Sequence, residues 1–155
     1  MLRNIRKFLD SLVDLIKDEN DETQERGFKF ATAALLIEMT RADFEVQREE
    51  LDAVADAIRS AFDLDEEETR DLVSLAEIEM DGATSLHEFT STLNAQLGPE
   101  QRHHVIELLW RVAYADGRLD KYEDHFVRKI ADLLYVRHSE FMKAKHRVRE
   151  ALGLS

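Results

Sequence analysis

Apolar residues recur at intervals of three and four along most of the chain, the spacing that places them on one face of an α-helix. The clearest case is residues 105–135, where one apolar helical run enters a short acidic turn and a second run leaves it. No segment longer than a few residues alternates between apolar and polar positions, as a half-buried strand would. The pattern predicts an all-α fold in which about eight helices form a compact bundle.

The second of these helices is expected to be central, because Leu35, Leu36 and Ile37 make it apolar on nearly every side. The chain has a single Pro and five Gly, too few for the many tight turns of a β fold, and this scarcity favours long helices. The expected helices cover about 2–17, 23–41, 47–62, 65–81, 85–97, 99 to the acidic turn, 121–135 and 139–152.

Capping signals mark several of these helix starts. Asp65 with Glu68, and Ser85 with Glu88, have the spacing of a capping box, in which a side chain at the helix start and one three residues later satisfy free backbone N–H groups. Ser139 is expected to cap the last helix in a similar way. These residues are therefore assigned structural roles rather than catalytic ones.

Two parts of the sequence resemble each other. Sliding it by 73 positions superposes two acidic corners, and six of thirty positions in residues 33–62 and 106–135 are then identical. The order of the helices repeats under the same shift. We therefore predict one domain over residues 1–155, built from a repeat of about 12–81 and 85–154 whose two halves are related by a pseudo-two-fold axis.

The amino-acid composition excludes several classes of function. The chain has 155 residues and no Cys, which excludes disulfides, thiolate metal sites and thiol catalysis. It shows neither a signal peptide nor a long apolar run, so we expect a cytoplasmic protein without stable membrane insertion. The net charge of −12 without a basic stripe argues against general nucleic-acid binding.

The charge is unevenly placed. Residues 43–81 carry 15 acidic and 3 basic side chains, whereas residues 137–155 carry 5 basic and 2 acidic ones. The acidic half is either a solvated surface or a docking face for a basic partner, and the basic last helix could contact an acidic partner or a second copy in a homodimer. The cations of that helix are Lys143, Lys145, Arg147 and Arg149.

The acidic corner at residues 113–123 reads Ala-Tyr-Ala-Asp-Gly-Arg-Leu-Asp-Lys-Tyr-Glu. This run, between two apolar helices in a duplicated helical chain, resembles the signature of the TerB-like family, named for bacterial tellurite-resistance proteins. The resemblance covers the chain from about Thr23 onward. It implies a compact helical bundle without known catalysis, associated with bacterial stress responses, whose acidic residues bind a divalent metal.

By position, Asp116 and Glu123 match the acids of this motif. Carboxylate oxygens are the ligands that Ca²⁺ or Mg²⁺ requires, and Asp120 lies close enough along the same turn to converge with them. The first copy of the corner offers Asp43 and Glu50. We therefore predict a divalent-cation site from these five residues, with helix capping as the alternative role for the same side chains.

The first corner departs from the motif, since Phe44 stands where the motif has Gly and Gln47 stands where the second copy has Asp. Any ion site could therefore be confined to the second corner. Tellurite itself need not be relevant to this member.

The sequence contains few of the motifs that mark an enzyme active site. A di-iron bundle needs two Glu-x-x-His motifs, and only Glu100 to His103 provides one. No nucleophile elbow or phosphate-binding Gly loop occurs, and Trp110 is expected in the core. The sequence thus predicts a non-enzymatic module that binds a cation, with a protein-interaction module lacking a metal site as the alternative, and an enzyme as a third class.

Overall fold

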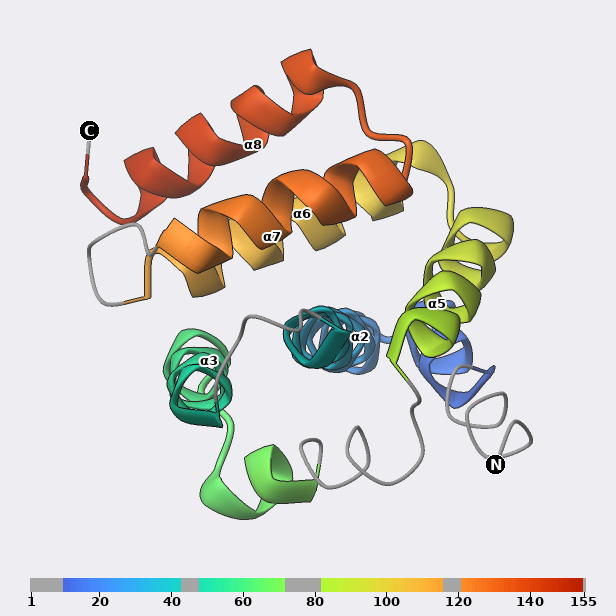
Figure 1. Ribbon diagram of the computed structural model, residues 1–155. Coiled ribbons are helices and arrows are strands. Elements are labelled where there is room, and N and C mark those ends of the chain that lie inside the picture. The colour runs from blue at the N-terminus through green and yellow to red at the C-terminus, as the bar shows by residue number, and fades with distance from the viewer. Residues whose placement is uncertain (1–9, 43–47, 72–81, 116–120, 155) are drawn as a thin grey trace.

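The computed structural model describes residues 10–42, 48–71, 82–115 and 121–154. These residues form helices and contain no strand, which confirms the all-α prediction (Figure 1). None of the described helices is both long enough and apolar enough to cross a membrane. The main helices are α2 (Asp21–Ala42), α3 (Arg48–Phe62), α5 (Gly82–Gln96), α6 (Pro99–Ala113), α7 (Lys121–Leu133) and α8 (His138–Ala151), and residues 10–16 and 66–71 are also helical.

Helix α2 is the centre of the bundle, as its all-round apolar sequence predicted. Leu35, Leu36 and Ile37 are fully buried, and α2 contacts α3, α5, α6 and α7. In Figure 1, α2 is seen nearly end-on between α3 and α5, beneath α6 and α7. Its start is fixed locally, because the Asn20 side chain accepts a hydrogen bond from the Thr23 backbone N–H at 3.0 Å.

Helices α6, α7 and α8 form a second group above α2. Helix α6 runs antiparallel to α7 and also contacts α8 (Figure 1). Trp110 is fully buried at this junction, and its indole N–H donates to the Phe141 carbonyl oxygen at 3.3 Å. The prediction that Trp110 belongs to the core is therefore confirmed.

Two of the predicted helix starts are right. The Glu68 backbone N–H donates to the Asp65 carboxylate at 2.7 Å, and the Asp65 N–H donates back to Glu68 at 3.4 Å. Helix α6 begins at Pro99, whose missing N–H is not needed in a first helical turn. The Gln101 side chain accepts from the Gly98 N–H at 2.9 Å, which closes this start.

Two other predicted helix starts are wrong. Helix α5 begins at Gly82, so Ser85 lies within the helix and not at its start. Helix α8 begins at His138 after an extended Arg137, and no side chain caps it. There the Phe141 N–H donates to the Arg137 carbonyl oxygen at 2.9 Å. This backbone hydrogen bond starts the helix one residue before Ser139. The direction in which the chain leaves α7 determines where α8 can begin.

Three helical segments end in a residue with left-handed backbone geometry: Asp63 (φ 54°), Tyr135 (φ 56°) and Gly153 (φ 73°). In each case the next backbone N–H donates to the carbonyl five residues earlier, at 2.8–3.1 Å. This arrangement usually relies on Gly, as at Gly153, because a Cβ is disfavoured there. A bulky Tyr at the same position is unusual and carries backbone strain.

The predicted repeat stays a prediction. Helices α2 and α6 each contact the helix that follows, α3 and α7 respectively, which is the order that a duplicated hairpin requires. Both corners that define the repeat, at residues 43–47 and 116–120, lie outside the described residues. The pseudo-two-fold axis and the boundaries of the two halves are therefore not tested.

Gly27 lies where α2 packs tightly against the helix at residues 10–16. A Cβ at this position would lie 2.7 Å from the Leu15 Cβ and 2.9 Å from the Ile16 backbone nitrogen. The Gln24 side chain bridges the same two segments by donating to the Ile16 carbonyl oxygen at 2.7 Å. The position is helical, so Ala would ordinarily be preferred by about 0.5–1 kcal/mol.

We predict that Gly27→Ala lowers the free energy of unfolding by about 1–2 kcal/mol, because overpacking against a neighbouring backbone exceeds the gain in helix propensity. Urea unfolding followed by circular dichroism measures the change. Ser91→Ala, at an exposed position within α5, is the matched control and should change stability by less than about 0.5 kcal/mol. A stabilised Gly27→Ala variant would contradict the close packing.

Candidate functional site

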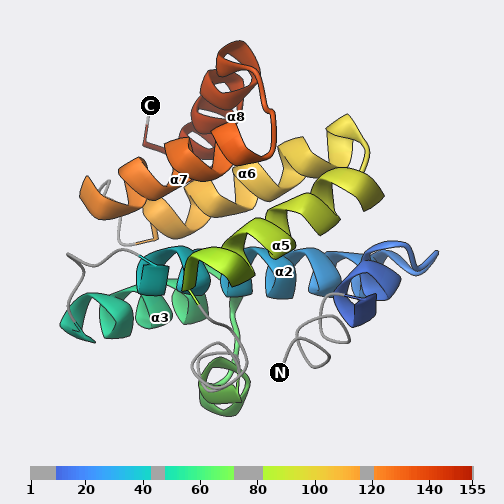
Figure 2. The same ribbon diagram turned by 45° about the vertical axis from the view of Figure 1, so that its right-hand side comes forward.

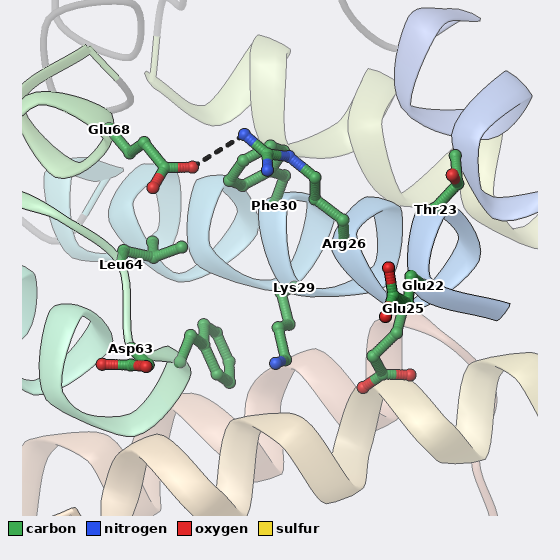
Figure 3. A pocket seen from close by; sticks show the side chains of 10 residues that line it. Glu22, Thr23, Glu25, Arg26, Lys29, Phe30, Asp63, Leu64 and Glu68 are labelled. Atoms are coloured by element: carbon green, nitrogen blue, oxygen red, sulfur yellow. Dashed lines mark hydrogen bonds and ion pairs between the residues drawn. The ribbon is translucent and has the colours of Figure 1, made fainter.

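A cleft of about 460 Å³ opens between the first half of α2, the end of α3 and residues 63–68 (Figure 3). It brings together two stretches of chain that are about forty residues apart in the sequence. The cleft combines an apolar lining with charges of both signs. Its lining residues are Glu22, Thr23, Glu25, Arg26, Lys29, Phe30, Phe62, Asp63, Leu64 and Glu68.

The apolar part of the lining comes from the way α3 ends. Phe62 is buried, and Leu64 and Phe30 are partly buried against the same core. Between Phe62 and Leu64, the left-handed Asp63 reverses the chain, and the Leu64 N–H donates to the Arg59 carbonyl oxygen at 3.1 Å. An Asp tolerates this geometry better than most side chains. The turn therefore exposes one carboxylate beside two apolar groups.

Arg26 holds the two sides of the cleft together. Its guanidinium lies 4.9 Å from the centre of the Phe30 ring and makes an ion pair with Glu68 at 2.8 Å, the dashed line in Figure 3. Glu68 also accepts the Asp65 N–H, so one carboxylate links α2 to the start of the helix at 66–71. The geometry assigns these two side chains to holding the cleft in shape.

Other charges of the cleft are available to a ligand. Within the part of the chain that the structure describes, Glu22, Lys29 and Asp63 have no ion-pair partner. The lining contains four carboxylates and two cations, so the cleft is negative on balance. A group with an apolar body and hydrogen-bond donors or positive charge at its edge suits such a lining.

A polar network leads from the cleft to the opposite group of helices. Glu25 accepts a hydrogen bond from His104 of α6 at 2.8 Å, and the other His104 ring nitrogen lies 3.9 Å from Glu107. The hydrogen bond and charge of Glu107 raise the pKa of Arg147 on α8. The edge of the His104 ring meets the Phe28 ring, with 4.8 Å between centres. His104 therefore joins α2 to α6, a role that its sequence did not suggest.

Comparison with known proteins identifies the family. A family model described as "Tellurite resistance protein TerB" matches residues 29–146, which is most of the chain. The chain belongs to the TerB family. No curated protein and no solved structure matches it. The TerB match extends from the first half of α2 into α8, so it includes both acidic corners and the part of the cleft formed by residues 62–68.

The predicted cation ligands of this TerB chain lie at the edge of what the structure describes. Asp43, Asp116 and Asp120 fall outside the described residues. Glu50 lies in the first turn of α3 and Glu123 in the first turn of α7, and the structure does not describe their side chains. Within the described residues, no group of three or more His, Asp or Glu side chains is placed to hold a metal ion.

Asp124 is the described residue next to the second corner. One of its oxygens lies 3.7 Å from Arg128, whereas the other is buried and no donor among the described residues reaches it. A buried carboxylate oxygen without a donor is costly and therefore calls for a partner. An unsatisfied acceptor therefore lies directly after the second corner of this TerB chain.

The cleft was not predicted from the sequence. Its walls come from two regions whose helical patterns are independent, and nothing in either pattern shows that they meet. Phe30 and Leu64 read as ordinary core positions, and Glu22 and Asp63 as solvated charges. The one available signal was the Asp65 capping box, which places a helix start there but not its neighbour.

The pair Arg26 and Glu68 gives a direct test of the cleft. We predict a coupling free energy of about 0.5–1 kcal/mol between Arg26→Ala and Glu68→Gln in a double-mutant cycle of unfolding. Gln is used at position 68 because it keeps the capping hydrogen bond. The coupling should weaken in high salt, because both side chains are partly exposed. Urea unfolding of the four proteins provides the measurement, and additive effects of the two substitutions would show that the pair is not formed.

Proposed function

We propose that this TerB chain works by binding rather than catalysis, and that its second acidic corner takes a divalent cation, Ca²⁺ or Mg²⁺, in a bacterial stress response. The observation that carries the proposal is the unsatisfied, buried oxygen of Asp124 in the first turn of α7. A hard cation bound by carboxylate oxygens is the partner that such a group would accept.

The helix bounds support the same location. Helix α6 ends at Ala113 and α7 begins at Lys121, so Asp116 and Asp120 belong to the connection between two helices in contact. Glu123 follows within the first turn of α7. Since negative charge is favoured at a helix start, these acids suit a site with or without the ion. In the first copy, Asp43 directly follows α2 and Glu50 lies in the first turn of α3.

Calorimetric titration with CaCl₂ and MgCl₂ tests the cation site. We predict saturable binding that Asp116→Ala removes, because a site of three or four carboxylates loses much of its charge with one of them. Asp132→Ala removes an exposed acid elsewhere on α7 and serves as the matched control, with binding unchanged.

Tryptophan fluorescence gives a second readout of the same titration. Trp110 lies near the corner through Tyr114, with 6.0 Å between ring centres, so cation binding at the corner should change its emission. If millimolar Ca²⁺ or Mg²⁺ produces no heat of binding and no fluorescence change, the ion site is rejected.

The surface favours a second function, protein interaction without a metal. Residues 52–71 carry eight acidic and two basic side chains, whereas residues 125–154 carry seven basic and three acidic ones. Opposite charge on separate parts of one molecule steers partners of opposite charge. A partner that binds equally well in a chelator would favour this function over ion sensing.

A further inference from the structure

Tyr135 is the most exposed large hydrophobic side chain among the residues that the structure describes. It is 78% exposed, it follows α7, and its backbone is left-handed with φ 56°. A Gly at this position would avoid the strain and would not place an aromatic ring in water. The fold thus presents an aromatic side chain where folding alone would favour its absence.

Basic residues precede and follow Tyr135 in the sequence. Arg128, Lys129, Arg137 and His138 are all exposed on α7 and at the start of α8. Arg128 and His138 line a small hollow of about 120 Å³ with Phe141, and Asp132 is the acid beside them. An exposed aromatic side chain followed closely in the chain by the exposed cation Arg137 suits a partner surface that is apolar at its centre and acidic at its rim.

The cleft beside α2 has that chemistry. Phe30, Phe62 and Leu64 give it an apolar lining, and Glu22 and Asp63 give it carboxylates without ion-pair partners among the described residues. Its volume of about 460 Å³ lies within the range of sites that enclose small organic groups, about 300–1,000 Å³. A tyrosine O–H could donate to either free carboxylate.

The two surfaces cannot meet within one molecule. The connection between α7 and α8 and the segment at residues 63–68 lie on opposite sides of the bundle in both views (Figures 1 and 2). Any contact between them must therefore join two copies of the chain.

We propose that a second copy of this chain inserts its Tyr135 into the cleft beside α2, with Arg137 facing the acidic rim. The contact uses two different surfaces and is therefore heterologous, so it leads from dimers to longer assemblies or a ring. It is independent of the cation site. Because one aromatic side chain is its centre, the contact is weak and transient, with a dissociation constant of about 10–1,000 µM.

Sedimentation velocity over a concentration series tests the proposal. The average mass of the wild-type chain should rise with concentration, and Tyr135→Gly should weaken association about thirtyfold or more, as truncation of a central aromatic anchor does. Tyr135→Gly should also raise the unfolding midpoint, since it removes the strained side chain. Loss of association therefore cannot be attributed to misfolding. Tyr135→Asn, which also tolerates a left-handed backbone, is a second variant with the same expected result.

Leu152→Ala is the matched control. Leu152 is the other exposed large apolar residue among those described, at 45%, and it lies at the end of α8. Its truncation should leave association unchanged.

A mixing experiment identifies the partner surface. Glu22→Arg combined with Asp63→Asn turns the charge of the cleft from negative to positive and leaves Tyr135 intact. This cleft variant and Tyr135→Gly should each be monomeric alone, but together they should form a 1:1 dimer, because each supplies the surface that the other lacks.

Three results would overturn the proposal: a wild-type chain that stays monomeric up to about 1 mM, a Tyr135→Gly variant that associates like wild type, or a mixture that stays monomeric. Repeating the series in EDTA separates this contact from the cation site. Association should be unchanged by the chelator, and its loss in EDTA would instead assign it to a bound ion.

Discussion

The burial of α2 on all sides is the constraint on which the structure depends. A helix whose middle is apolar on nearly every side must be enclosed by other helices, and here α3, α5, α6 and α7 do so. Helix α6 is itself buried on two sides, against α2 and against α8, whereas the described residues of α3, α5 and α7 leave an outer face exposed. The strongly acidic character of the chain is therefore compatible with a well-formed core.

The candidate sites lie where this enclosure stops. The first half of α2 is covered less completely, and the cleft forms there between α2 and the end of α3. The acidic corners follow α2 and α6 in the sequence. At the cleft, the left-handed Asp63 reverses the chain, so carboxylates lie beside apolar side chains.

Features set by the local sequence pattern were predicted better than features that depend on contacts between distant residues. The helices, the central position of α2 and the burial of Trp110 follow from periodicity, because an amphipathic pattern states which face must be buried. The starts of α5 and α8 were predicted at Ser85 and Ser139, whereas the helices begin at Gly82 and His138. At α8, a backbone hydrogen bond from Phe141 to the Arg137 carbonyl oxygen outweighs the side-chain capping signal. Of the predicted cation ligands, Glu50 and Glu123 do lie at helix starts, as the spacing required.

The sequence by itself determined the all-helical architecture, the charge separation and the TerB motif at the second corner, since each is written in neighbouring residues or in composition. Only the tertiary structure decided that Arg26 meets Glu68 across a cleft, that His104 meets Glu25, and that Tyr135 remains exposed on a strained backbone. The physical reason is that periodicity specifies which face of a helix is buried but not which helix buries it. Contacts between distant residues depend on how the faces are paired.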